Sequence, residues 1–199
     1  MRRVTGLSRS ELIARGGKGA ALLIAGSTVA QLASPARAAV SDGDLAHARL
    51  LVALELLLLD FYSRAIRSGR SASRLELGRA RAAERRNYDA VGAILVDAGQ
   101  VPATAQDIDF SYPRGSFSSY ARIGRLGVRL ESLAVGAYLG AERSLETPLY
   151  RSHAARIAAS EAQHLSVFSA SAGGRPLGPP LPAALPIARV SDALDAYTS

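Results

Sequence analysis

Four glutamates at matching places in two halves of the chain are the residues best suited to do chemistry. The segment VALELLLLDFY aligns with VRLESLAVGAY, and RAAERRNYDAV aligns with AASEAQHLSVF. The alignment pairs Glu55 with Glu131, Tyr62 with Tyr138, Glu84 with Glu161, and Asn87 with His164. The two glutamates of a half lie 29 residues apart in the first half and 30 in the second. Such a repeat indicates two copies of one structural unit.

These glutamates lie on the apolar faces of predicted helices. Glu55, for example, has Leu51 and Leu58 four and three residues away, and these positions share a helix face. Four carboxylates would then meet inside a bundle, where buried charge is costly and like charges repel. Two divalent metal ions would balance the four charges. His164 follows Glu161 by three residues and lies on the same face, so both can reach one ion.

Four helices would position these side chains. Apolar residues recur with a helical period, and capping residues mark the helix ends. The predicted helices cover residues 44–68, 73–98, 117 or 119 to 145, and 148–171. The expected N-terminal caps are Asp44, then Ser71 or Ser73, and Thr147 before Pro148, while Gly69 and Gly99 would end the first two helices.

The helices predict an all-α fold of two helical hairpins. A long crossover of mixed polar, aromatic and proline residues joins the hairpins, and we expect it to be ordered. The chain then divides into a leader at 1–38, a four-helix bundle at 44–171 and a proline-rich tail at 172–199. Within the tail, Ser191 would cap a short terminal helix that runs through Tyr197.

The order Glu, Glu-x-x-His, Glu, Glu-x-x-His resembles the ferritin-like di-metal carboxylate proteins, which include ferritins, rubrerythrins and manganese catalases. The segments DFSYPRGSF, VRLESLAVGAYLGAE and IAASEAQHLSVF resemble exported bacterial ferritin-like domain proteins in particular. The resemblance covers about residues 45–170 and implies a ferritin-like four-helix bundle with two iron or manganese ions. The implied metal ligands are Glu55, Glu84, Glu131, Glu161 and His164. Tyr62 and Tyr138 would donate hydrogen bonds to the carboxylates.

Two residues depart from this pattern. Asn87 stands where the family has a second histidine, and a neutral amide oxygen is a poorer ligand for iron or manganese. Arg81 precedes Glu84 by three residues, where the second half has Ala158. An inward Arg81 would neutralise Glu84 and replace a metal ion. The alternative is therefore a metal-free bundle with a buried Arg–Glu network.

Residues 1–38 have the three parts of a secretory signal peptide. A basic region precedes an apolar stretch at about 20–30, and Ala36-Arg37-Ala38 matches a small-x-small cleavage pattern. A bilayer span would need about 20 apolar residues. The stretch SRSELIARGGKGA resembles a twin-arginine signal with Ser10 at the second arginine, so the twin-arginine and Sec routes both stay open. We expect export to the periplasm, cell envelope or extracellular space, with a mature start near Ala39; the alternatives are an uncleaved membrane anchor and a disordered basic tail.

Composition excludes several classes of chemistry. The chain has no cysteine, which excludes disulfides, iron–sulfur clusters and cysteine-bound zinc. Lys18 is the one lysine and lies in the leader, so a catalytic lysine in the bundle is excluded. The net charge of +7 is concentrated in residues 1–38, which hold six basic residues and one acidic residue. The remainder is almost neutral, so we expect no nucleic-acid binding.

The sequence leaves more than one function open. The first is a di-iron or dimanganese oxidoreductase acting on oxygen, peroxide or ferrous iron, whose partner is then a small molecule or iron. The second is a metal-free four-helix bundle with a structural, binding or stress-protection role in the cell envelope. Iron storage is third, because the leader and the proline-rich tail do not suggest a storage cage. A homo-oligomer, and membrane contact through an uncleaved leader, are compatible with each.

Overall fold

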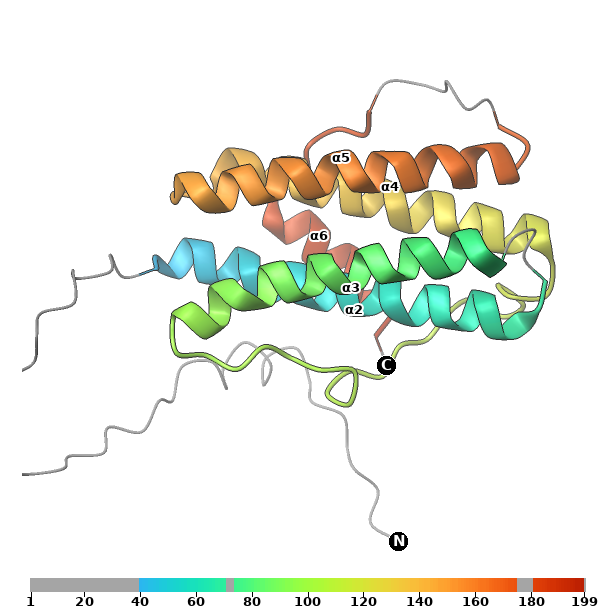
Figure 1. Ribbon diagram of the computed structural model, residues 1–199, viewed down its shortest axis with the longest axis horizontal. Coiled ribbons are helices and arrows are strands. Elements are labelled where there is room, and N and C mark those ends of the chain that lie inside the picture. The colour runs from blue at the N-terminus through green and yellow to red at the C-terminus, as the bar shows by residue number, and fades with distance from the viewer. Residues whose placement is uncertain (1–39, 71–73, 175–180, 199) are drawn as a thin grey trace, which may run out of the picture.

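The computed structural model describes residues 40–70, 74–174 and 181–198, so every expectation about the leader lies outside the described residues. The described part is all-α and forms a four-helix bundle with one additional helix (Figure 1). The helices are α2 (Asp42–Ser68), α3 (Arg74–Asp97), α4 (Tyr120–Ser144), α5 (Pro148–Ser171) and α6 (Ile187–Asp195). The predicted fold class is confirmed, because α2 packs on α3 and α4 packs on α5 as two hairpins.

The first hairpin begins and ends at residues with clear local roles. Ser41, rather than the predicted Asp44, caps α2: its hydroxyl accepts a hydrogen bond from the backbone N–H of Asp44 at 3.1 Å. The buried Asp44 carboxylate instead accepts the backbone N–H groups of Glu146 and Thr147 at 2.7 and 3.1 Å. Gly69 ends α2 with a φ of 64°, a left-handed conformation that glycine adopts without strain. The predicted caps Ser71 and Ser73 lie outside the described residues.

An ordered crossover connects the two hairpins. Tyr112 donates a hydrogen bond to the carbonyl of Leu57 in α2 at 3.2 Å. Ser111 donates its backbone N–H to the carbonyl of Tyr197 at 2.8 Å, and Phe110 forms an isolated β-bridge with Thr198. The crossover is therefore held both to α2 and to the end of the described chain.

Helix α6 differs from the predicted terminal helix. It begins at Ile187, after Pro186, and not at Ser191. The reason is a long-range contact: Leu185 donates its N–H to the carbonyl of Gly136 in α4 at 2.8 Å and lies against Gly140. This contact fixes the chain just before Pro186, whose ring cannot continue a preceding helix but readily starts one.

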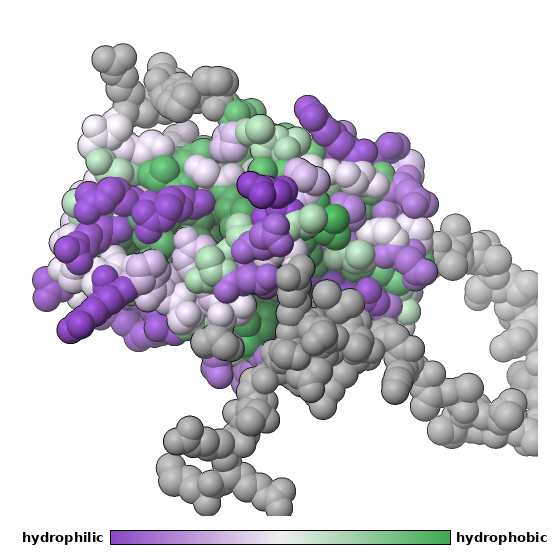
Figure 2. Space-filling model, turned by 180° about the vertical axis from the view of Figure 1, so that it is seen from behind, coloured by the Kyte–Doolittle hydropathy of each residue, from purple (hydrophilic) through white to green (hydrophobic). Residues whose placement is uncertain are grey.

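Helix α6 covers the open side between α2 and α4, where it buries Val190 and Leu194 (Figure 1). On the molecular face behind the view of Figure 1, hydrophobic residues lie between hydrophilic ones (Figure 2). Because α2 packs against α3, α4 and α6, its leucine-rich centre is buried on all sides. None of the described helices combines the length and apolar character needed to cross a membrane.

Candidate metal centre

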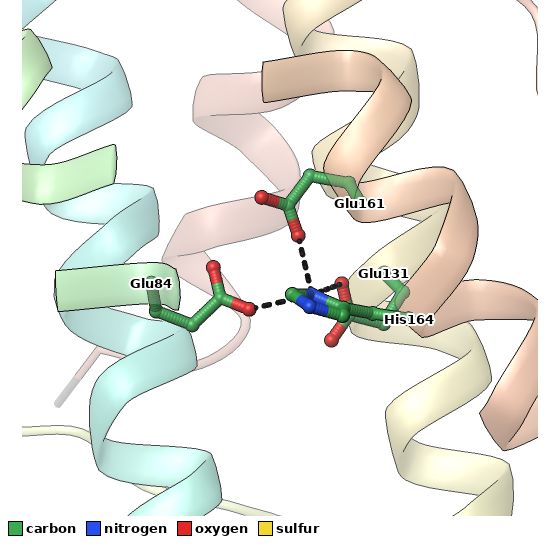
Figure 3. Close-up of side chains that lie close together, drawn as sticks. All are labelled: Glu84, Glu131, Glu161 and His164. Carbon is green, nitrogen blue, oxygen red and sulfur yellow. Dashed lines mark hydrogen bonds and ion pairs between the residues drawn. The ribbon is translucent and has the colours of Figure 1, made fainter. Parts of the chain in front are cut away.

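Three glutamates and one histidine from three helices meet inside the bundle. Glu84 comes from α3, Glu131 from α4, and Glu161 with His164 from α5 (Figure 3). One potential ligand atom from each of these residues lies within 4.8 Å of the others. The three glutamates have no exposed surface, whereas the His164 side chain is 14% exposed. The single-turn spacing of Glu161 and His164 on α5 thus gives the adjacency expected from the sequence.

His164 lies close to all three glutamates of this group. Its Nδ1 atom lies 2.8 Å from Oε1 of Glu84, 3.2 Å from Oε2 of Glu161 and 4.0 Å from Oε2 of Glu131 (Figure 3). One imidazole nitrogen therefore faces carboxylates from three helices. This nitrogen is where a cation is electrostatically favoured, whether the cation is the protonated imidazole itself or a metal ion.

Two tyrosines tie the hairpins together through the first and third glutamates. Tyr62 of α2 donates a hydrogen bond to Oε1 of Glu131 in α4, and Tyr138 of α4 donates one to Oε1 of Glu55 in α2. All four side chains are fully buried. The structure thus places both tyrosines as hydrogen-bond donors to carboxylates, as the sequence predicts. Glu55 is buried beside Tyr138 and is not among the four residues that converge within 4.8 Å.

Asn87 takes part in the cluster as a donor. Its amide nitrogen donates to Oε1 of Glu161 at 2.6 Å and lies 3.4 Å from Oε2 of Glu84. From the sequence, Asn87 is expected only as a poorer metal ligand at the position of a second histidine. Its position one turn after Glu84, facing Glu161 of the other hairpin, gives it a bridging role between the two hairpins.

The prediction that Arg81 could point inward is wrong. Its side chain is exposed, and its Nε donates to the hydroxyl of Ser63 in α2 at 2.7 Å. The physical reason is helical geometry: Arg81 and Asn87 lie about 60° from Glu84 on opposite sides around the helix axis, so that Asn87 faces α5 and Arg81 faces α2. That rotation directs the long side chain of Arg81 to the outer groove between α2 and α3, where its charge stays hydrated. The positive partner of Glu84 is His164.

Burial and mutual repulsion dominate the electrostatics of the cluster. Burial, together with the charges of Glu84 and Glu161, raises the pKa values of Glu55 and Glu131 well above the ordinary 4.5. Burial also raises the pKa of Glu84 to about 7, although its hydrogen bond to His164 opposes the increase. Burial disfavours the charged imidazole, but hydrogen bonds to Glu161 and Glu84 outweigh it and raise the pKa of His164 to about 10.

The donor set fits divalent metal ions. Oε2 of Glu55 and Oε2 of Glu131 are buried and accept no hydrogen bond within the described parts of the chain. A buried acceptor without a partner is costly, and a metal ion would satisfy it. Carboxylate oxygens and an imidazole nitrogen are ligands suited to iron and manganese, and the site contains no sulfur ligand that would favour a softer metal. Binding would require deprotonation of the carboxylates and of the ligating imidazole nitrogen.

Comparison with known families decides the classification. A family model described as a ferritin-like domain matches residues 43–174. The chain belongs to the ferritin-like family. A search of curated proteins finds no match. The matched part of this ferritin-like domain contains nearly all of α2 and the whole of α3, α4 and α5, and therefore every residue of the buried cluster.

Phe168 of this ferritin-like domain was not singled out by sequence reasoning. It lies four residues after His164 on the same face of α5, and its ring centroid is 5.8 Å from that of Tyr62 and 5.5 Å from that of Phe61. Its spacing from His164 is the signal that would have identified it. Phe168 therefore packs with Phe61 and Tyr62 beside the cluster.

Proposed function

We propose that this ferritin-like domain binds two divalent ions of iron or manganese and acts as an oxidoreductase on oxygen, peroxide or ferrous iron. The observation that carries the proposal is the convergence of buried Glu84, Glu131, Glu161 and His164. Glu55 adds a fourth buried carboxylate with an oxygen that lacks a hydrogen-bond partner within the described chain. Four such charges are balanced by two divalent ions and are unfavourable without compensation.

The protein side chains would have distinct roles. Glu84, Glu131, Glu161, Glu55 and His164 would hold the ions, which when bound supply the capacity for one-electron chemistry. Tyr62 and Tyr138 hold one oxygen of Glu131 and of Glu55 and so leave the other oxygen directed for ligation. Asn87 restrains Glu161 in the same way. The leucine-rich walls exclude bulk water and strengthen these interactions.

Metal content is the direct test. Wild-type protein isolated without chelator is expected to contain iron or manganese, and loading with Fe(II) under anaerobic conditions or with Mn(II) should raise its melting temperature. His164→Ala should reduce bound metal, because it removes the imidazole donor that three carboxylates surround. Asn87→His should increase retention by adding an imidazole beside Glu84. Elemental analysis and thermal unfolding with and without chelator measure each outcome.

A second candidate is a metal-free bundle with a structural, binding or stress-protection role. The observation in its favour is that His164 and Asn87 give Glu84 and Glu161 partners from the protein itself. Under this alternative the wild-type protein contains no metal, and its melting temperature responds neither to Fe(II) or Mn(II) nor to chelator. That combined result would end the oxidoreductase proposal and leave the fold assignment intact.

We further propose that the protein acts outside the cytoplasm. The support is the order of basic, apolar and small-x-small segments in residues 1–38. Processing should yield a mature N-terminus near Ala39. N-terminal sequencing of the protein from the exported fraction measures this, and recovery of an intact Met1 there would favour an uncleaved anchor.

A further inference from the structure

A hollow of about 280 Å³ reaches the buried cluster from one side of the bundle. It lies between α3 and α5, at the end of the bundle where α3 and α4 begin and α5 ends. We call it the α3–α5 hollow. Its inner lining is formed by Tyr62, Leu77, Ile123, His164 and Phe168, and the more exposed Val167 lies nearer its mouth. The opposite side of the bundle, between α2 and α4, is covered by α6 (Figure 1).

The inner end of the hollow meets the cluster at His164. This side chain is 14% exposed, whereas Glu84, Glu131 and Glu161 have no exposed surface. Tyr62, which holds Glu131, also lines the hollow, and its ring packs edge-on to the imidazole at a centroid distance of 6.1 Å. A molecule in the α3–α5 hollow would therefore contact the ligand set through His164, whose imidazole packs against Tyr62, without disturbing the carboxylates.

The lining selects against charged occupants. Leucine, isoleucine, alanine and aromatic side chains dominate the inner walls. The charge of the His164 imidazole is already balanced by the three carboxylates behind it, so an ion placed against these walls would lose hydration without a free charged partner there. The charged residues Glu76 and Arg79 are exposed and lie at the rim, where Gln163 adds an amide. The walls therefore favour a neutral, mainly apolar molecule, and the rim offers a hydrogen bond to one polar substituent.

The volume selects for size. A water molecule occupies about 30 Å³, and pockets for drug-sized ligands begin at about 300 Å³. Oxygen or peroxide alone would leave most of the hollow unfilled, whereas a peptide would exceed it. A single substituted aromatic ring fits, and the exposed ring of Tyr120 and the edge of Phe168 supply aromatic surface with which it can pack.

We infer that the α3–α5 hollow binds a small, neutral aromatic molecule with one polar substituent, next to His164 and Tyr62. Its role as an organic co-substrate of the metal centre rests on the proposed function, whereas its binding does not. Among the lining residues only His164 is a proposed metal ligand, so ligand binding and metal binding can be tested separately.

Indole is a suitable probe because the chain has no tryptophan, so indole can be excited selectively at wavelengths longer than those the seven tyrosines absorb. Full-length protein treated with chelator should bind indole saturably with one site per chain. Phenol should compete with indole. Benzoate, a ring of similar size with a negative charge, should compete at least about tenfold more weakly, a difference of about 1.4 kcal/mol. Equal competition by benzoate, or the absence of saturable binding, would overturn the inference.

Filling the hollow gives the matched test. Val167 lines it and is 52% exposed, so Val167→Phe should fold normally and weaken indole binding about tenfold or more. Val96 of α3 is similarly exposed at 61% but lies outside the hollow, so Val96→Phe should leave the affinity unchanged. Ala80→Leu is a second filling variant with the same expected loss. Unchanged affinity in both filling variants, with helicity intact, would show that indole binds elsewhere.

The two proposals fail in different ways. Val167→Phe should retain the metal content of the wild type, because Val167 contributes no ligand. Indole binding in protein that contains no metal under any loading condition would support the hollow as a ligand site and remove its role in redox chemistry. Metal binding without indole binding would reject the inference and leave the metal centre in place.

Discussion

Replacing both Glu55 and Glu131 with glutamine is expected to stabilise the metal-free protein by about 2 kcal/mol at mildly alkaline pH and to abolish metal binding. Both carboxylates are fully buried, and in each of them one oxygen lacks a hydrogen-bond partner among the described residues. Glutamine keeps the shape and the oxygen that accepts from Tyr138 or Tyr62, and it removes a buried charge. Chemical denaturation in the presence of chelator and elemental analysis measure the two effects.

The same substitutions should flatten the pH dependence of stability. A raised carboxyl pKa means that the folded protein holds the proton more tightly than the unfolded chain. That contribution to stability is complete below the ordinary value of 4.5 and is lost as the pH rises through the folded pKa, which for Glu84 is about 7. His164 acts in the same direction, since its pKa rises from 6.5 to about 10. The metal-free wild type should therefore lose stability as the pH increases from about 5 to 9.

The double variant should show a shallower loss over this range, because two of the groups with raised pKa values, Glu55 and Glu131, no longer titrate. Glu146→Gln is the control, since Glu146 is an exposed glutamate that is not part of the buried cluster. It should change neither the stability nor the metal content. A double variant that is less stable than the wild type in chelator would contradict the view that these buried charges are unfavourable without metal.

Gly140→Ala is expected to destabilise the protein by about 3 kcal/mol. A Cβ atom at this position would overlap the backbone carbonyl of Leu185, and backbone cannot move aside as a flexible side chain can. The substitution should separate the segment before α6 from α4 and expose the α2–α4 side. Urea unfolding monitored by circular dichroism would measure the loss, and hydrogen exchange would show early exchange in α6.

Gly78→Ala provides the matched control. Gly78 lies in α3, and a Cβ atom there meets no neighbour within 4 Å. Alanine has the higher helix propensity, so this variant should be as stable as the wild type or more stable by up to about 1 kcal/mol. Equal stability of Gly140→Ala and Gly78→Ala would mean that the contact between Leu185 and α4 is not part of the stable fold.

Much of the bundle and its cluster could be predicted because the signals are local or repeated. Gly69 marks the end of α2 as expected, and the internal repeat brings Glu84, Glu131 and Glu161 to one place. Whether these residues and Glu55 bind metal stays a prediction. The repeat is informative because burial of several acids at equivalent positions is improbable in a helix pair that is stabilised only by apolar packing.

The incorrect predictions from the sequence are explained by contacts between segments far apart in the chain. Asp44 satisfies the requirements of an N-cap, but the backbone N–H groups of Glu146 and Thr147 recruit its carboxylate, and Ser41 caps the helix instead. Arg81 is near the boundary between the inner and outer faces of α3, and Ser63 on a neighbouring helix decides its direction. The start of α6 depends on the contact of Leu185 with α4, which no local pattern records.

The exchange of hydrogen bonds between the hairpins gives the bundle the character of a symmetric pair. Tyr62 of the first hairpin bonds Glu131 of the second, and Tyr138 of the second bonds Glu55 of the first. This reciprocity is the contact pattern of a two-fold symmetric dimer, in which each copy offers the partner the same residue that it receives. Each hairpin therefore holds the carboxylate of the other, and neither carboxylate is positioned by its own hairpin alone. The symmetry is incomplete, because one half carries the imidazole of His164 where the other carries the amide of Asn87.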